Sequence, residues 1–158
     1  NDHVGTFEVT NHTINYLKNR LGKNPEYACC VYPTSILIDK KDITATYKII
    51  REGKWNFFFV TSFNHLPPPQ RGFYINKAKL KMIDRKNYKS RTQDLKKIFN
   101  DAGQFYWGKA DSWLKKKFLY LAKSFGFDLP RYRAIDVDDI KDLNLLKKIF
   151  YSSLDKKK

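Results

Sequence analysis

Apolar residues recur at helical spacing in three parts of the chain. The first pattern runs from Phe7 and predicts a helix that Gly22 closes. The second predicts a helix that begins at Asp39 and ends at Gly53. The third predicts a final helix from Ile140, with core spacing through residue 150. The chain is therefore expected to contain at least three amphipathic helices.

Apolar runs of strand length lie between these helices. Residues 27–32 and 57–60 are continuously apolar, which is typical of strands covered on both faces. Residues 101–108 alternate, so that Gln104 and Tyr106 share one face of a strand. The order strand, helix, strand indicates a βαβ unit, and therefore a mostly parallel sheet with right-handed crossovers.

The segment from residue 72 to residue 98 does not fit this alternation. Residues 72–83 predict a β-hairpin that turns at Asn76 and Lys77, and a polar, irregular stretch follows it. A two-stranded hairpin is marginally stable alone in water. We therefore expect an inserted arm, at about residues 72–98, that packs against a second subunit as a homodimer.

Composition limits the chain to one globular domain. Its 158 residues are 42% hydrophobic, and no apolar run approaches the length of about 20 residues that a membrane helix needs. Membrane association is therefore not expected. Cys29 and Cys30 are adjacent, and neighbours on a strand face opposite ways, so a disulfide between them is not expected. Reduced thiols in a cytoplasmic protein are the simplest interpretation.

The net charge of +15 raises the hypothesis of a nucleic-acid-binding domain. The lysines, however, occur in scattered groups of two or three, and no nucleic-acid-binding motif accompanies them. We interpret most of them as solvated faces that together attract anions. No nucleic-acid partner is expected, and a site for a polyanionic nucleotide would benefit from the same field.

Candidate chemistry is concentrated in residues 131–142. A strand-like run ends in acids there, and strand geometry would place Asp136 and Asp138 on one side. Magnesium is commonly held by one or two carboxylates, with waters and substrate phosphates as the other ligands. The pair thus predicts a Mg²⁺ site. The alternative is that Asp138 or Asp139 only caps the next helix. Neither GxGxxG nor GxxxxGK[ST] occurs in the chain.

Six short segments resemble one known family in order and spacing. They are Asp2-His3-Val4-Gly5-Thr6, Tyr32-Pro33-Thr34-Ser35, Pro69-Gln70-Arg71, Ser90-Arg91-Thr92-Gln93-Asp94-Leu95, Asp101-Ala102-Gly103-Gln104-Phe105-Tyr106-Trp107-Gly108 and Asp136-Val137-Asp138. The chain is similar to the cytidylyltransferases that activate nonulosonic acids, and most similar to their pseudaminic acid branch. The segment from Asp101 is the most specific signal. After Asp138, the Thr-Pro that is usual in the family is replaced by Asp139 and Ile140.

The resemblance implies a fold and a domain organisation. The family fold is a Rossmann-like nucleotide-sugar transferase three-layer sandwich, with a mostly parallel sheet and an inserted hairpin arm for dimerisation. Residues 1–158 would be the C-terminal two-thirds of the cytidylyltransferase domain. The family's N-terminal strand, with the loop that cradles the CTP phosphates, would be missing. The isolated chain is therefore expected to be weakly active or inactive.

The resemblance also implies a reaction, in which CMP passes from CTP to a pseudaminic or sialic type of acid and pyrophosphate leaves. Asp136 and Asp138 would hold Mg²⁺ as the catalytic residues. The resemblance places two residues at the nucleotide, Thr6 and Ser35. It places five at the sugar or the floor of its pocket: Tyr32, Gln70, Arg71, Arg91 and Gln104.

Several of these residues have alternative interpretations. Ser35 can cap the following helix, Arg91 can be a surface residue, and Gln104 can serve only sheet packing. Arg71 can pair with an acid of the hairpin. For the whole chain, the alternatives to an enzyme are a catalytically inactive remnant that still dimerises and, less favoured, a basic nucleic-acid-binding domain.

Overall fold

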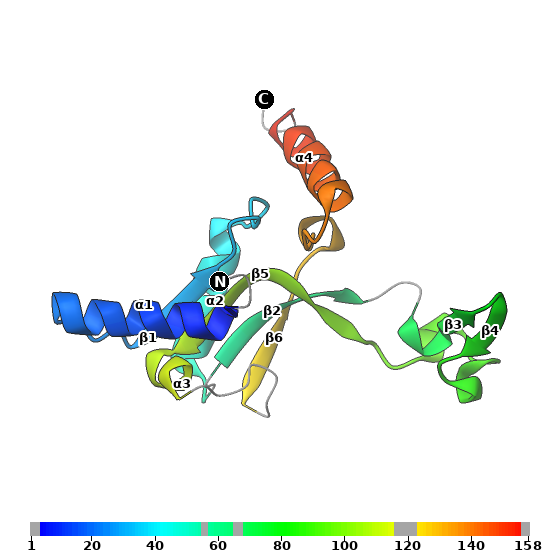
Figure 1. Cartoon of the computed structure of the whole chain (residues 1–158), viewed down its shortest axis with the longest axis horizontal. Helices are drawn as coiled ribbons and strands as arrows, with labels where there is room; N and C mark the ends of the chain where they lie inside the picture. Colours follow the sequence, from blue (N-terminus) through cyan, green and yellow to red (C-terminus); the bar gives the residue numbers. More distant parts are fainter. Residues whose placement is uncertain (1–3, 55–56, 65–67, 116–122, 156–158) are drawn as a thin grey trace.

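The computed structural model describes residues 4–54, 57–64, 68–115 and 123–155, and Figure 1 shows their helices and strands. The helices are α1 (Thr6–Leu21), α2 (Lys40–Glu52), α3 (Ala110–Leu114) and α4 (Ile140–Asp155). The strands are β1 (Tyr27–Val31), β2 (Phe57–Asn64), β3 (Phe73–Asn76), β4 (Lys79–Met82), β5 (Phe99–Lys109) and β6 (Ser124–Asp128). The expected α/β class is confirmed.

The main sheet has four strands in the order β1-β5-β2-β6. Strand β5 is antiparallel to both of its neighbours, and only β2 and β6 pair in parallel. The prediction of a mostly parallel sheet is therefore wrong for the pairing of the described strands. Strands β1 and β2 still run in the same direction, as a βαβ unit requires. The prediction failed because a later strand, β5, is inserted between them, which the order along the chain does not reveal.

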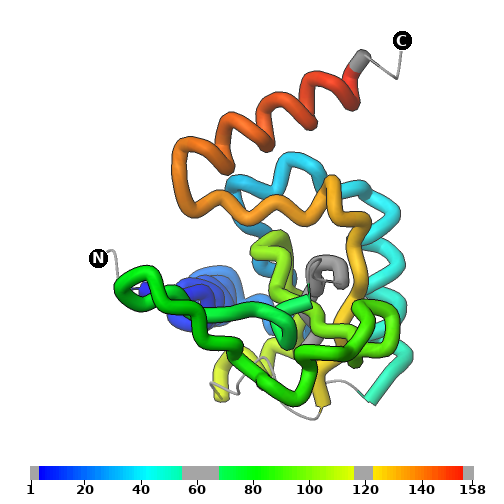
Figure 2. Tube along the Cα trace, turned by 90° about the vertical axis from the view of Figure 1, so that its right-hand side faces the viewer, coloured from blue at the N-terminus to red at the C-terminus, as the bar shows by residue number. Residues whose placement is uncertain are grey.

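Helices α1 and α2 cover opposite faces of this sheet (Figure 2). The alternation of side chains along β1 explains both layers, because Cys30 packs against the cluster that contains Ile14 of α1, whereas Cys29 packs against the cluster that contains Ile50 of α2. Both cysteines are free thiols, and burial raises the pKa of Cys29 to about 12. Strand β1 thus has the two buried faces that its continuous apolar run predicted.

The predicted ends of the first two helices are confirmed. Helix α1 ends at Gly22, whose φ of 62° is in the left-handed region that glycine favours. Helix α2 begins after Asp39, whose carboxylate accepts the backbone N–H of Lys41 at 2.8 Å. The Asp42 carboxylate accepts the N–H of Asp39 in return, so that the two acids form a capping box.

The strand predicted in residues 131–137 is wrong. Residues Arg131–Arg133 form a single 3₁₀ turn, and residues 134–137 belong to no helix or strand. The strand lies earlier, at β6, in a stretch for which no strand was predicted. Phe125 and Phe127 alternate there and pack into the cluster on the α2 side. The glycine between them weakened the strand pattern in the sequence.

The predicted arm is present and extends from one end of the main sheet (Figure 1). Strands β3 and β4 pair as an antiparallel hairpin, with Phe73 opposite Met82 and Ile75 opposite Leu80. The turn is at Lys77 and Ala78, both with positive φ, one residue later than predicted. Residues 84–98 contain two further 3₁₀ turns and no strand.

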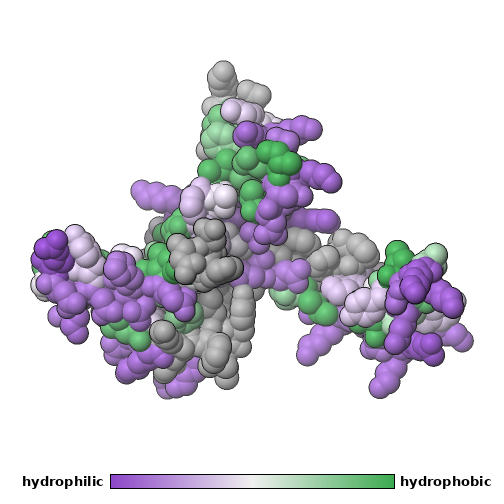
Figure 3. All heavy atoms as spheres, viewed as in Figure 1, coloured by the Kyte–Doolittle hydropathy of each residue, from purple (hydrophilic) through white to green (hydrophobic). Residues whose placement is uncertain are grey.

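Helix α4 projects from the opposite side of the molecule from α3, above the sheet in Figure 1. On the predicted core face Leu146 is buried and Ile140 is exposed, and the other three residues are half-buried: Leu143, Ile149 and Phe150. The predicted core face is therefore covered only in part. Figure 3 shows hydrophobic residues at the surface of α4 and of the arm. Among the described residues, no helix has the length and apolar character needed to cross a bilayer.

Candidate functional site

Four side chains from distant parts of the chain form one hydrogen-bonded series on the α1 face of the sheet. The hydroxyl of Thr6, at the start of α1, is bonded to the hydroxyl of Tyr32, just after β1. The ring of Tyr32 lies 5.4 Å from that of Tyr106 on β5. The Tyr106 hydroxyl donates to Oδ2 of Asp101 at 2.8 Å. Of the first family segment, Asp2 and His3 lie outside the described residues.

Tyr106 is buried at the centre of this series. Burial raises its pKa, and the charge and hydrogen bond of Asp101 raise it further. The phenol therefore stays protonated and donates to the carboxylate. Asp101 and Tyr106 belong to the most specific family segment, but neither was selected as a site residue. Regular alternation places residues five apart on opposite faces of a strand, so the contact between these two side chains was not predictable from their spacing.

Asp101 also connects this series to Asp136. Its Oδ1 accepts the backbone N–H of Gly103 at 3.0 Å. Gly103 has a φ of 58°, and the Asp136 carboxylate lies directly against it. A Cβ atom at Gly103 would overlap that carboxylate. The Asp136 carboxylate therefore packs directly against the backbone of β5, and only glycine at position 103 leaves the space for it.

Asp136 and Asp138 remain close although they do not lie on a strand. Burial raises the pKa of Asp136, and the negative charge of Asp138 raises it further. Asp139, not Asp138, caps α4: its carboxylate accepts the N–H groups of Lys141 and Asp142. The capping alternative therefore applies to Asp139 and leaves the Asp136–Asp138 pair as the candidate for a metal.

The pair fits Mg²⁺ in the chemistry of its ligands. The described residues contain no group of three or more His, Cys, Asp or Glu side chains arranged to hold a metal. Magnesium does not require such a group, because one or two carboxylates suffice where waters and phosphates complete the shell. Burial, and then the charge of Asp138, raise the pKa of Asp136, and a divalent cation beside the pair would stabilise the charged carboxylates.

Gln104 and Ser35 lie beside this cluster and are both buried. The Ser35 hydroxyl donates to the backbone carbonyl of Gln104 at 2.7 Å. Since Asp39 caps α2, the alternative that Ser35 caps that helix is wrong. Gln104 donates to two backbone carbonyls, those of Ala102 and Ile135. The structure thus brings Thr6, Tyr32, Ser35, Gln104 and Asp136 together.

Three of the predicted site residues are not brought to this cluster. Gln70 and Arg71 lie in the 3₁₀ turn Pro69–Arg71 just before the arm, and Arg91 lies within the arm. Gln70 donates to the carbonyl of Lys96 at 2.6 Å, and its Oε1 is buried without a partner among the described residues. Arg91 is exposed and pairs with Asp94 at 2.7 Å, as its surface alternative states. Arg71 is exposed, and no ion pair joins it to another described residue.

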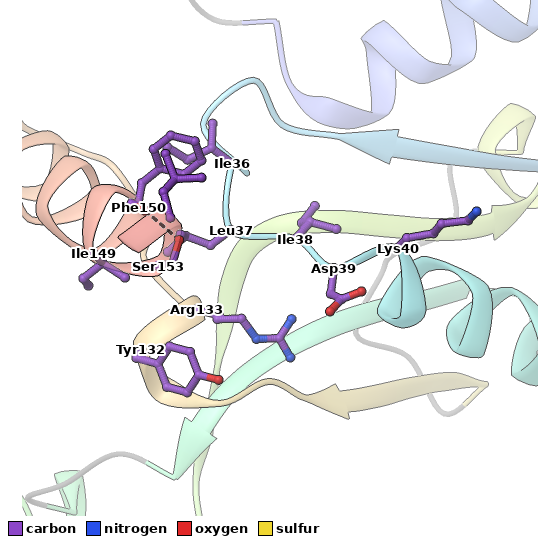
Figure 4. Close-up of a pocket in the computed structure, with 11 residues that line it drawn as sticks. Ile36, Leu37, Ile38, Asp39, Lys40, Tyr132, Arg133, Ile149, Phe150 and Ser153 are labelled. Atoms are coloured by element: carbon purple, nitrogen blue, oxygen red, sulfur yellow. Dashed lines mark hydrogen bonds between the residues drawn. The ribbon is translucent and has the colours of Figure 1, made fainter. Parts of the chain in front are cut away.

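A cavity of about 480 Å³ lies between α4 and the loop that leads into α2 (Figure 4). Ile36, Ile149 and Phe150 are among its apolar lining residues, and Asp39 and Arg133 are among its polar ones. Arg133 is held there by an ion pair with Asp42. None of the predicted site residues lines the cavity, so it is separate from the candidate site.

No family model matches the chain. Two proteins of Campylobacter jejuni subsp. jejuni, each named pseudaminic acid cytidylyltransferase, align with most of it. The serotype O:2 protein is 34% identical over 151 residues, which are 94% of this chain and 64% of the relative. The serotype O:23/36 protein is 37% identical over 127 residues, 79% of this chain and 54% of the relative. The chain is a relative of the pseudaminic acid cytidylyltransferases.

A third relative is longer. It is a Helicobacter pylori protein named pseudaminic acid cytidylyltransferase and UDP-2,4-diacetamido-2,4,6-trideoxy-beta-L-altropyranose hydrolase. It is 26% identical over 139 residues, which are 88% of this chain and 26% of the relative. The resemblance seen in the six segments is confirmed. The chain spans 54–64% of the length of the two Campylobacter relatives.

Proposed function

We propose that the complete protein containing this chain transfers CMP from CTP to a nonulosonic acid of the pseudaminic or sialic type and releases pyrophosphate. The observation that carries this proposal is the Asp136–Asp138 pair, in which the Asp136 carboxylate lies against Gly103 of the segment that most resembles the family. The names of the relatives support the cytidylyltransferase class. The proposal extends their activity to a chain that spans only part of their length.

In this proposal Asp136 and Asp138 hold Mg²⁺ beside the CTP phosphates, where the ion neutralises negative charge. Phosphoryl transfer requires mainly positioning and charge neutralisation. The protein supplies the positioning, because Asp101 fixes Gly103, and Gly103 fixes the place of the Asp136 carboxylate. The net charge of +15 favours the approach of a polyanionic nucleotide.

The substrate contacts rest on the same arrangement. The hydroxyl groups of Thr6 and Tyr32 are bonded to each other next to Tyr106, and Ser35 secures the Tyr32 loop to β5. We assign Thr6 and Ser35 to the nucleotide side of the site and Tyr32 to the floor between nucleotide and sugar. Free Cys29 and Cys30 thiols are compatible with a cytoplasmic enzyme.

The proposal also includes a homodimer that forms through the arm. Arg91 lies on the arm, and Gln70 and Arg71 lie in the turn just before it, away from the carboxylates of the same chain. A second copy packed on the arm would bring charged and amide groups to its neighbour's site. The complete domain would then have the Rossmann-like three-layer architecture of its family, with residues 72–98 as its dimerisation arm.

The experiment measures pyrophosphate release by the complete protein with CTP, Mg²⁺ and pseudaminic acid. We expect release that requires Mg²⁺ and falls by more than about 100-fold in Asp138→Ala, since a lost metal contact removes transition-state stabilisation. Asp111→Ala is the matched control, because that carboxylate is 81% exposed and lies on α3. The isolated 158-residue chain is expected to show little or no release.

Absence of release with every nonulosonic acid tested would contradict the enzymatic proposal. Dimerisation without release would favour the inactive remnant. Salt-sensitive DNA binding without any dependence on CTP would favour the nucleic-acid alternative.

A further inference from the structure

Gln104 occupies an unusual position for a residue assigned to sugar binding. It lies in the middle of β5 and is only 2% exposed. Its side-chain nitrogen lies 3.0 Å from the carbonyl oxygen of Ala102 and 2.8 Å from that of Ile135. Two carbonyl oxygens can be faced only by the amide NH₂ group, so the orientation of the side chain is fixed by its partners.

The backbone of Gln104 also holds the loop that follows β1. Its carbonyl oxygen accepts the N–H of Tyr32 at 2.9 Å and the hydroxyl of Ser35 at 2.7 Å. Gln104 therefore connects three parts of the chain: the loop after β1, strand β5 and the segment before Asp136. A residue that makes these connections is a structural centre of the candidate site.

The bond from Gln104 to Ile135 restrains the backbone next to Asp136. Residues 134–137 belong to no helix or strand and therefore lack the backbone ladder that would fix them. Ile135 directly precedes Asp136, whose carboxylate must rest on Gly103. The Gln104 amide is thus a direct tie between β5 and the backbone that carries the carboxylate.

We propose that Gln104 is a positioning residue that holds Asp136 at the metal site, and that it does not bind the sugar. This inference rests on the proposed Mg²⁺ site. Both amide hydrogens are already donated inside the protein. To bind a sugar, the side chain would have to abandon two buried carbonyls, each at a cost of about 1–3 kcal/mol.

The test compares Gln104→Met, which keeps the length of the side chain but removes both donors, with Thr46→Val. Thr46 is fully buried on α2 and also donates to a backbone carbonyl, so it controls for loss of a buried hydrogen bond elsewhere. The complete protein is used throughout. If Gln104→Met does not fold, Gln104→Glu replaces it.

The first readout is amide hydrogen exchange in residues 134–138 without metal. We expect exchange there to be at least about 10-fold faster in Gln104→Met, and unchanged in Thr46→Val. The second is Mn²⁺ affinity, measured from the spin-resonance signal of free Mn²⁺ in the presence of CTP. Loss of a residue that orients a ligand typically weakens metal affinity by about 10–100-fold. The KM for the sugar is expected to change less than about twofold.

A rise in the sugar KM with unchanged exchange and Mn²⁺ affinity would overturn the inference and place Gln104 against the sugar. Unchanged values in all three measurements would overturn it as well. The proposed function can be contradicted independently of this inference. If Mn²⁺ binding depends on Asp136 and Gln104 but no pyrophosphate is released, the positioning role of Gln104 is supported and the proposed reaction is contradicted. If the wild type binds no Mn²⁺, the metal site and this role for Gln104 both fall.

Discussion

Gly103 shows how one residue type can satisfy two requirements at once. Its φ of 58° places the backbone in a conformation that side chains rarely adopt. Independently, the carboxylate of Asp136 occupies the space that a side chain would take. The first requirement concerns the local turn of β5, and the second concerns the site. A substitution there should therefore damage both stability and metal binding.

Gly103→Ala separates these two effects when it is compared with Gly22→Ala. Gly22 has a similar φ of 62°, but open space surrounds the position of its missing Cβ. We expect each alanine to cost about 1 kcal/mol from backbone strain. Gly103→Ala should cost about 1–3 kcal/mol more, because a packed neighbour must move. Urea denaturation measures both, and Mn²⁺ binding should weaken only in Gly103→Ala.

Asp136 should make metal-free stability depend on pH in the direction opposite to most aspartates. Burial and Asp138 raise its pKa in the folded protein above the unfolded value. Its contribution to stability is then fully present below the unfolded pKa and is lost as pH rises through the folded pKa. We expect Asp136→Asn to raise the urea midpoint at pH 7.5 in EDTA, and to raise it less at pH 4.5.

Asp111→Asn is the control for that measurement and should leave the urea midpoint nearly unchanged, since its carboxylate is highly exposed. An Asp136→Asn variant that is less stable than the wild type at pH 7.5 would show that the carboxylate is not electrostatically unfavourable in the absence of metal.

At the level of elements, the sequence predicted what local patterns determine. Helix α2 began at Asp39 and ended at Gly53 as predicted, because a capping box and a glycine define those ends through neighbouring residues. The antiparallel insertion of β5 was not predicted, since pairing is decided by contacts between distant segments. Strand β6 was missed for a related reason: Phe125 and Phe127 become strand residues by pairing with β2.

The residues of the candidate site were also predicted only in part. The motifs selected Thr6, Tyr32 and Asp136, which the fold brings together. They did not indicate that Gln104 uses its amide within the protein, because hydrogen-bond partners such as the Ile135 carbonyl are set by tertiary structure. The family resemblance alone gave Gln104 and Gln70 the same role.

The segment before Asp136 has a second tie, to α2. Arg133 forms a largely buried ion pair with Asp42, and Asp42 also belongs to the capping box of that helix. We expect Arg133→Ala to lower the free energy of unfolding by about 2–4 kcal/mol, because Asp42 is left buried and unpaired. Chemical denaturation measures the loss.

Arg91→Ala is the matched control for that prediction. Its pair with Asp94 is exposed on the arm, so its loss should cost less than about 1 kcal/mol. Equal losses in the two variants would mean that the Arg133 pair adds little to the attachment of residues 131–135.

At the level of the whole molecule, contacts within the chain do not explain how the arm is stabilised. One face of the hairpin carries Phe73, Ile75 and Leu80, which share a side of the two-stranded sheet and are all more than half exposed. The other face carries Tyr74 and lysines. An isolated hairpin with an uncovered apolar face is marginal in water. The proposed second copy would cover it and make the arm stable.

Ile75→Lys tests this proposal against Tyr74→Lys, its neighbour on the opposite face. The two positions are 70% and 64% exposed, so they differ mainly in the face that they occupy. If the apolar face is the dimer contact, Ile75→Lys should weaken dimerisation by at least about 30-fold, the effect of losing one central contact worth about 2 kcal/mol. Tyr74→Lys should change it little. Sedimentation equilibrium measures both constants. Equal weakening of dimerisation in the two variants would mean that an added charge on either face disfavours the dimer. A monomeric wild type would contradict the proposal that a second copy covers the arm.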